Sequence, residues 1–106
     1  MEIKLYVKSN GKCPYLVWLN ELDIAVRMRV QARIARLKDD EHFGESKMIS
    51  RGLYELKFRT IGGGIRIYFG KDGDRVVVLL LGGNKSRQEN DIIKAKIYWN
   101  DYTTSG

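Results

Sequence analysis

Residues 52–87 read GLYELKFRTIGGGIRIYFGKDGDRVVVLLLGGNKSR, and this stretch decides the fold class. In residues 53–59 and 64–70, apolar side chains alternate with polar or charged ones, as in a strand with one apolar and one polar face. Residues 76–81 are apolar at every position, which indicates a strand covered on both faces. Gly62–Gly64 and the pair Asp72-Gly73 supply the two turns. The stretch therefore predicts a three-stranded antiparallel meander.

The sequence before this stretch predicts one more strand and two helices. Residues 2–8 alternate apolar and polar side chains, so we expect an edge strand, with residues 76–81 as a candidate neighbour. Pro14 suits the first position of a short helix, and Asp23 is the predicted N-cap of a second helix that ends near Asp40. The apolar stripe of the second helix consists of Val26, Val30, Ile34 and Leu37.

The fold class that follows is α+β, in one domain over residues 1–106. We expect an antiparallel sheet of about four strands, with residues 76–81 central, a helical hairpin and a C-terminal helix, in the order β-α-α-β-β-β-α. Residues 41–51 are expected to be a polar connection. Ser86 and Glu89 fit a capping box that starts the last helix, which ends near Tyr102. We expect the helices to cover the apolar face of the sheet and leave its charged face open.

The composition points to a polyanionic partner. Nineteen Lys and Arg against thirteen Asp and Glu give a net charge of +6 in 106 residues. Such a charge favours nucleic acid, an anionic membrane or an acidic protein as partner, although a soluble basic surface is an alternative. A single cysteine excludes an internal disulfide, and the absence of a Cys/His cluster predicts no metal site. No signal peptide or membrane-spanning run is recognised, so a cytoplasmic protein is expected.

The candidate site lies on the charged face of the meander. Antiparallel pairing of residues 53–59 with 64–70 places on one face the residues Glu55, Lys57, Arg59, Arg66 and Tyr68. Lys85 and Arg87 follow the third strand. Like charges side by side destabilise a sheet by up to about 1 kcal/mol per pair. A cluster of cations that is kept despite this cost suggests a ligand that neutralises it, such as a phosphodiester. The alternative interpretation is an ordinary solvent-exposed sheet face.

A second basic feature is an arginine row on the second helix, which includes Arg29 and Arg33. We expect these two residues either to bind RNA or to form an ordinary solvated helix face.

Three segments carry a resemblance to a known family: residues 53–59 (LYELKFR), 64–69 (GIRIYF) and 76–86 (VVVLLLGGNKS). They resemble the RelE superfamily of toxins, and most closely its HigB-like branch, often called addiction module killer proteins. The order of strands and helices agrees over almost the whole chain. The resemblance implies the toxin of a type II toxin–antitoxin system, which cleaves mRNA on the ribosome without a metal or cofactor. It also implies a cognate antitoxin of helix-turn-helix type and a toxin–antitoxin hetero-oligomer.

The resemblance also implies roles for individual residues. Lys57 and Arg59 match basic strand positions that contact the scissile phosphate, and Arg66 matches a stabiliser of transition-state charge. Lys85 matches a second basic position, as acid or phosphate clamp. Glu55 replaces a lysine proposed as base in some relatives, so it is expected to act as base or to pair with Lys57 or Arg66.

A further departure concerns the C-terminal region. Asp91 stands near a tyrosine of such relatives, whose contribution is missing here or comes from Tyr68. The alternative to an endoribonuclease is a basic module that binds RNA or protein without cleavage, such as a degenerate toxin or phage protein.

Overall fold

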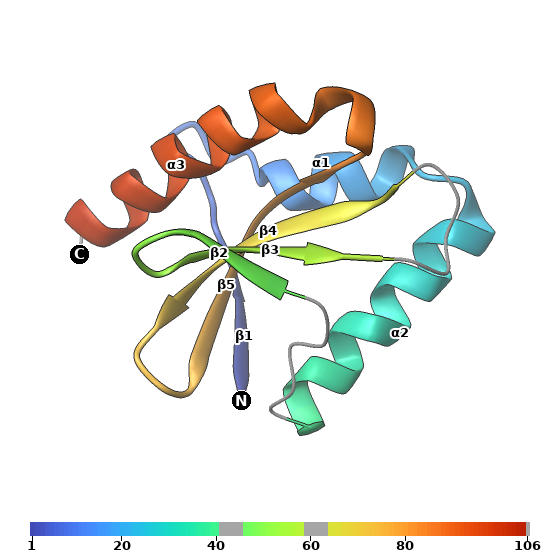
Figure 1. Ribbon diagram of the computed structural model, residues 1–106, viewed down its shortest axis with the longest axis horizontal. Helices are drawn as coiled ribbons and strands as arrows, with labels where there is room; N and C mark the ends of the chain where they lie inside the picture. The colour runs from blue at the N-terminus through green and yellow to red at the C-terminus, as the bar shows by residue number, and fades with distance from the viewer. Residues whose placement is uncertain (41–45, 59–63, 106) are drawn as a thin grey trace.

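The computed structural model describes residues 1–40, 46–58 and 64–105 (Figure 1). It confirms the α+β class and the predicted helices. In chain order, the elements are β1 (Glu2–Leu5), α1 (Pro14–Glu21), α2 (Ile24–Asp40), β2 (Ser46–Ser50), β3 (Leu53–Lys57), β4 (Arg66–Asp72), β5 (Val76–Gly83), the 3₁₀ helix η1 (Lys85–Arg87) and α3 (Gln88–Thr104).

The strands form one mixed sheet in the order β1-β5-β4-β3-β2. The meander of β3, β4 and β5 is antiparallel, as predicted, and its second turn contains Gly73 with φ of +72°. At the edge, β1 pairs with β5 in parallel, with Glu2 opposite Val76 and Leu5 opposite Leu79. As predicted, the strand of residues 76–81 lies inside the sheet and pairs with the N-terminal strand, whereas the unpredicted β2 extends the far side of the sheet and leaves β4 in the middle.

The strand β2 lies in the stretch that was predicted to be a polar connection. It pairs antiparallel with β3, with an irregularity between Met48 and Ser50. Met48 is 61% exposed, and Ile49 is half-buried. An edge strand has one neighbour and buries few side chains, so its sequence need not show an apolar alternation. The sheet therefore has five strands instead of about four.

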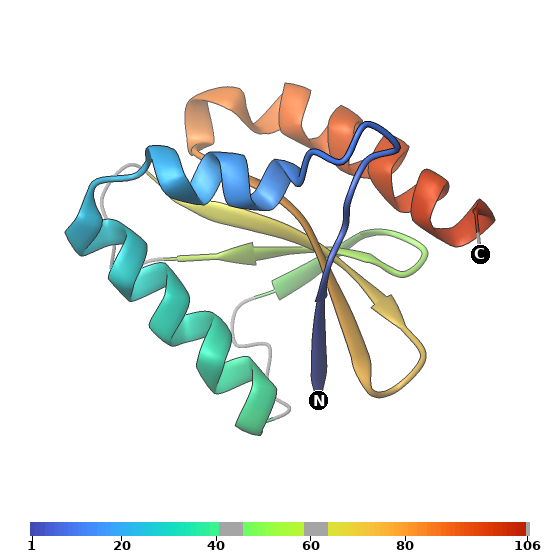
Figure 2. The same cartoon turned by 180° about the vertical axis from the view of Figure 1, so that it is seen from behind.

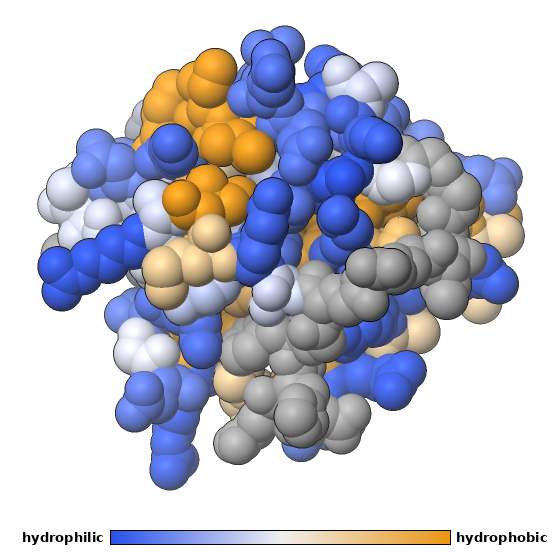
Figure 3. Space-filling model, in the orientation of Figure 1, coloured by the Kyte–Doolittle hydropathy of each residue, from blue (hydrophilic) through white to orange (hydrophobic). Residues whose placement is uncertain are grey.

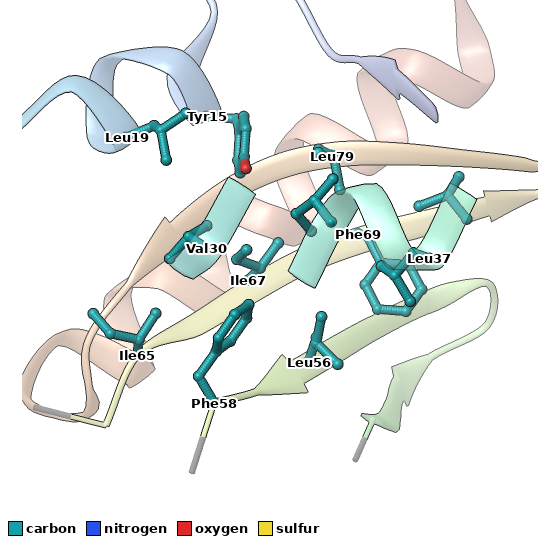
Figure 4. Close-up of a cluster of buried hydrophobic side chains, with 12 residues drawn as sticks. Tyr15, Leu19, Val30, Leu37, Leu56, Phe58, Ile65, Ile67, Phe69 and Leu79 are labelled. Atoms are coloured by element: carbon teal, nitrogen blue, oxygen red, sulfur yellow. The ribbon is translucent and has the colours of Figure 1, made fainter. Parts of the chain in front are cut away.

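One face of the sheet is covered by α1 and α2 (Figure 4). As predicted, Pro14 is the first residue of α1. The side chain of Asp23 accepts a hydrogen bond from the Ala25 N–H at 3.2 Å, which satisfies a donor at the start of α2. The buried core on this face consists of Tyr15, Leu19, Val30, Ile34, Leu37, Leu56, Phe58, Ile65, Ile67, Phe69, Val77 and Leu79. Three members of the predicted stripe of α2 are thus in the core.

The opposite face, which was predicted to be open, is covered by α3. Figures 1 and 2 show α3 on the other side of the sheet from α2. The second core consists of Tyr6, Leu53, Tyr68, Val78, Leu80, Leu81 and Ala95, with Ile92, Tyr98 and Trp99 packed against it. A Cβ at Gly70 would clash with the Trp99 ring, so this glycine lets the indole lie directly on β4.

The start and end of α3 are held by polar contacts. The predicted capping box does not form, because the Ser86 hydroxyl donates to the Asn84 side-chain oxygen at 2.6 Å and η1 precedes the helix. Near the other end, the Tyr6 hydroxyl donates to Asp101 at 2.5 Å, and the Tyr102 hydroxyl donates to Asp72 at 2.9 Å. These bonds join α3 to the segment after β1 and to the end of β4.

The surface over the middle of α3 is apolar, whereas much of the face in Figure 3 is hydrophilic. Ile93 and Ile97 are 58% and 60% exposed, and they lie one turn apart on this helix. Within the described ranges, no helix combines the length and the apolar character needed to cross a membrane.

Candidate active site

Strand pairing brings the predicted residues together at one end of the sheet. Glu55 lies opposite Tyr68, and Lys57 lies opposite Arg66. Arg66 in turn lies opposite Gly83 at the end of β5, and Lys85 follows two residues later in η1. The prediction that the residues of β3 and β4 share one face is therefore confirmed for the described residues. Arg59, Gly62 and Gly63 lie outside them.

These side chains divide into a buried and an exposed group. The buried ones are Glu55, Arg66 and Tyr68, which are 1%, 5% and 0% exposed. Lys57 and Lys85 are exposed. The prediction of an open charged face is thus wrong. Charged groups can be buried when they are paired and hydrogen-bonded, and this condition allows α3 to cover the face.

Glu55 is the centre of the buried group. Its Oε1 lies 3.6 Å from Arg66 Nε and 3.9 Å from Lys47 Nζ, and its Oε2 accepts a hydrogen bond from Gln88 Nε2 at 2.9 Å. Of the expected partners, Arg66 is confirmed by this geometry. Lys47 and Gln88 were not predicted. Lys47 belongs to the unpredicted β2, and Gln88 carries no charge that a search for clustered ions would select.

Gly64 lies next to both Arg66 and Lys85. The Gly64 carbonyl accepts a hydrogen bond from Arg66 Nη1 at 2.8 Å. A Cβ at Gly64 would lie 3.1 Å from that Nη1 and 3.0 Å from Lys85 Cβ. The φ of Gly64 is +63°, a conformation that L side chains rarely adopt. A glycine is therefore required for Arg66 and Lys85 to meet at this point of the backbone.

Two more polar groups are buried on the face of the sheet that carries Glu55 and Arg66. The Tyr68 hydroxyl and Asp91 Oδ2 have no hydrogen-bond partner among the described residues. Burial, followed by the negative charges of Glu55 and Asp91, raises the pKa of Tyr68, so its phenol stays protonated at neutral pH. Burial also raises the pKa of Asp91, while the charges of Arg87 and Lys94 oppose this shift.

Asp91 and the glycines at the end of β5 fit closely. A Cβ at Gly83 would clash with the Asp91 carboxylate, and a Cβ at Gly82 would clash with the Trp18 ring. The space beside these two glycines is thus occupied by side chains of the protein.

The remaining predicted residues lie elsewhere. Arg29 and Arg33 belong to α2, which covers the opposite face of the sheet from Glu55. Arg87 is exposed at the end of η1 and borders a cavity between α1 and α3. In the described part of the chain, no group of three or more His, Cys, Asp or Glu side chains could hold a metal ion. What the site offers chemically is positive charge at one end of a sheet, with two exposed lysines beside a buried arginine.

Comparison with known proteins relates the chain to a family and to a bacterial protein. Residues 17–100 match the model of a family described as "Phage derived protein Gp49-like (DUF891)". An uncharacterized protein of Haemophilus influenzae is 37% identical over 81 residues, which cover 76% of this chain and 80% of that relative. The family match runs from within α1 to within α3 and includes every residue of the site described above.

Proposed function

The chain belongs to the Gp49-like family of phage-derived proteins, part of the RelE/HigB-like toxin superfamily, and from this membership we propose that it is the toxin of a type II toxin–antitoxin system. Its proposed activity is metal-independent cleavage of mRNA on the ribosome, in the cytoplasm. The proposed partners are a cognate antitoxin of helix-turn-helix type, which holds the toxin in a hetero-oligomer, and the translated message.

The observation that carries this proposal is the gathering of cations around Gly64. Lys57 is the cross-strand neighbour of Arg66, and Lys85 lies against the glycine whose carbonyl binds Arg66. Two exposed ammonium groups thus flank a buried guanidinium. A phosphodiester carries the charge that such a cluster attracts, and lysine and arginine are the usual residues that bind it.

The proposed reaction is attack by a ribose 2′-hydroxyl on the adjacent phosphorus. The 2′-oxygen loses its proton to a water molecule and forms a bond to phosphorus, the bond from phosphorus to the 5′-oxygen breaks, and the 5′-oxygen gains a proton from an acid of the protein. The products are a 2′,3′-cyclic phosphate and a 5′-hydroxyl end. Negative charge grows on the phosphate oxygens in the transition state, so preorganised cations accelerate this step.

Each residue of the cluster has a proposed part in this reaction. Lys57 and Lys85, which are exposed, contact the phosphate, and Lys85 gives the proton to the leaving 5′-oxygen. Arg66 stabilises the developing charge from below, where burial weakens the screening by water. Glu55 is a positioning residue, because it holds Arg66 Nε at 3.6 Å and is itself covered by Gln88.

Induction in a bacterial host tests the proposal. The wild type is expected to arrest growth and to produce new 5′-hydroxyl ends inside translated messages. Lys57→Ala combined with Lys85→Ala should abolish both effects, whereas the exposed Arg75→Ala in the β4–β5 turn serves as a control that keeps them. The absence of arrest and of cleavage with the wild type, at an expression level matched to a known ribosome-dependent ribonuclease, would refute the proposed activity.

A second candidate function is binding of RNA or protein without cleavage. The burial of Glu55, Arg66 and Tyr68 favours it, because these three candidate catalytic side chains have almost no exposed surface. Co-sedimentation with ribosomes separates the two functions. A wild type that binds ribosomes but leaves the message intact is a binding module, and one that cuts the message is the proposed enzyme.

A further inference from the structure

A cavity of about 320 Å³ lies at the end of β5, between α1 and the start of α3. Figures 1 and 2 both show these two helices side by side at this point. Its size falls at the lower end of the range of ligand pockets, about 300–1,000 Å³. The floor is formed by Leu81, Gly82 and Asp91, which are buried. The function proposed above makes no use of this cavity.

Four basic side chains line the cavity: Lys8, Lys12, Arg87 and Lys94. They come from the loop after β1, from η1 and from α3, so only the folded chain brings them together. Lys12, Arg87 and Lys94 are exposed. Glu21 at the end of α1 is the acidic side chain at the rim, so cations outnumber anions around the opening. This balance suits a ligand that carries phosphate.

Two aromatic rings border the same space. Trp18 is half-buried and rests on Gly82, where the lack of a Cβ lets the indole approach β5. Tyr98 is half-buried and stacks on Tyr6, with ring centroids 5.1 Å apart. Lys8 Nζ lies 5.9 Å from the Tyr98 centroid. Aromatic rings next to cations are the combination that binds single-stranded nucleic acid, in which bases stack and phosphates meet positive charge.

The floor of the cavity is closed by Asp91 of α3, which is 5% exposed. Its Oδ2 lies against Gly83 of β5, which does not line the cavity. The preference for a ligand that contains a base as well as a phosphate therefore comes from the aromatic rings of Trp18 and Tyr98.

We propose that this cavity binds one nucleotide of a single-stranded RNA, with the base against Trp18 and Tyr98 and the phosphates on the surrounding lysines and Arg87. This inference rests on the proposed function, which sets the position of the bound nucleotide along the message. Arg87 is the last residue of η1, and Lys85, which is proposed to contact the scissile phosphate, is the first. A strand that leaves Lys85 along η1 reaches the cavity, which then fixes a nucleotide next to the cleaved bond.

Binding of 2′-O-methyl RNA octamers tests the proposal, because such RNA cannot undergo 2′-hydroxyl attack. Fluorescence anisotropy of labelled octamers would be measured with the wild type, Arg87→Glu and Arg75→Glu. The two arginines are exposed and lie at opposite ends of β5, so the variants share the same change of charge. We expect Arg87→Glu to weaken binding at least about tenfold and to lower the dependence on salt, and Arg75→Glu to change it less than about twofold.

Stacking is tested separately with Tyr98→Leu and its matched control Tyr98→Phe. Loss of a stacked base weakens binding by about five-fold to one-hundred-fold, whereas the phenylalanine ring keeps the stack. Polyphosphate of the same charge serves as a probe without bases. Tyr98→Leu should leave polyphosphate binding unchanged.

The outcomes separate this inference from the proposed function. Equal effects of Arg87→Glu and Arg75→Glu on RNA, or equal effects of Tyr98→Leu on RNA and polyphosphate, would overturn the nucleotide site. Binding that follows the expected pattern supports the site even if the wild type cleaves no message, in which case only the proposed function fails.

Discussion

Glu55 and Arg66 form an ion pair beneath the start of α3, with Oε1 3.6 Å from Nε and both side chains almost completely buried. Gln88, the first residue of α3, lies over the pair and donates a hydrogen bond to Glu55 Oε2. Removing two charges from water is costly, so the loss of either partner leaves an uncompensated buried ion. The pair therefore couples the stability of the protein to the position of its candidate catalytic arginine.

Glu55→Ala is expected to lower the free energy of unfolding by about 3–5 kcal/mol, since Arg66 remains buried without its partner. Lys47→Ala, which removes the exposed partner of the same carboxylate, should cost about 1 kcal/mol or less. Urea denaturation measures both values. The double variant Glu55→Ala/Arg66→Ala should be more stable than the sum of the single losses predicts. Additive losses would show that the two charges are not coupled.

Gly64→Ala is expected to lower stability and to reduce cleavage of mRNA, because the new methyl group would press on Arg66 Nη1 and Lys85 Cβ. Gly73→Ala is the matched control. Gly73 has a similar φ of +72°, but a Cβ there would meet nothing within 4 Å. Both variants carry the backbone strain of about 1 kcal/mol, and only Gly64→Ala should disturb the site. Primer extension on a translated message and urea denaturation separate the two effects. Equal cleavage by the two variants contradicts the proposed part of Gly64.

Arg66→Ala is expected to reduce cleavage at least about 10²-fold, the effect of removing one preorganised charge stabiliser. Because Arg66 is also part of the buried pair, the folded fraction of the variant must be measured by circular dichroism. Arg66→Lys keeps the charge but not the fork of N–H donors, so it should retain more stability than Arg66→Ala. A folded Arg66→Ala variant with unchanged cleavage would exclude Arg66 from the reaction.

Stability should fall at high pH through buried tyrosines. Burial, with a smaller contribution from Cys13, raises the pKa of Tyr15 to about 12, whereas an unfolded tyrosine titrates near about 10. The folded-state pKa is the higher one, so this contribution is complete below about pH 10 and is lost as the pH rises to about 12. Between about pH 9 and pH 11, the free energy of unfolding of Tyr15→Phe should therefore fall by about 1 kcal/mol less than that of the wild type. Parallel pH curves for the two proteins would contradict this assignment.

The sequence predicted the features that depend on local patterns. The alternation in β3 and β4 and the hairpin signal at Gly73 predicted the antiparallel meander, because each rests on neighbouring residues. Pro14 and Asp23 marked the starts of α1 and α2 for the same reason. The shared face of Glu55, Lys57, Arg66 and Tyr68 followed from the alternation together with antiparallel pairing.

The covering of this face by α3 could not be derived from alternation. A charged side chain was taken to face water, whereas Glu55 and Arg66 neutralise each other and Gln88 donates a hydrogen bond to Glu55. A usable signal was present in the glycines within the strands. Gly70 and Gly83 mark the points where Trp99 and Asp91 of α3 contact the sheet. The strand β2 carried no comparable signal, because an edge strand buries little.

The parallel pairing of β1 with β5 has a consequence for synthesis of the chain. Glu2 pairs with Val76, so the first strand leaves the ribosome long before its partner exists. Contacts between such distant residues form slowly, since a long loop must close first. Gly83, the cross-strand neighbour of Arg66, also belongs to β5, and Gln88 is synthesised later still. In a nascent chain, β1 therefore has no partner strand until β5 has been synthesised. The Glu55–Arg66 pair likewise lacks the hydrogen bond from Gln88 until translation has passed β5.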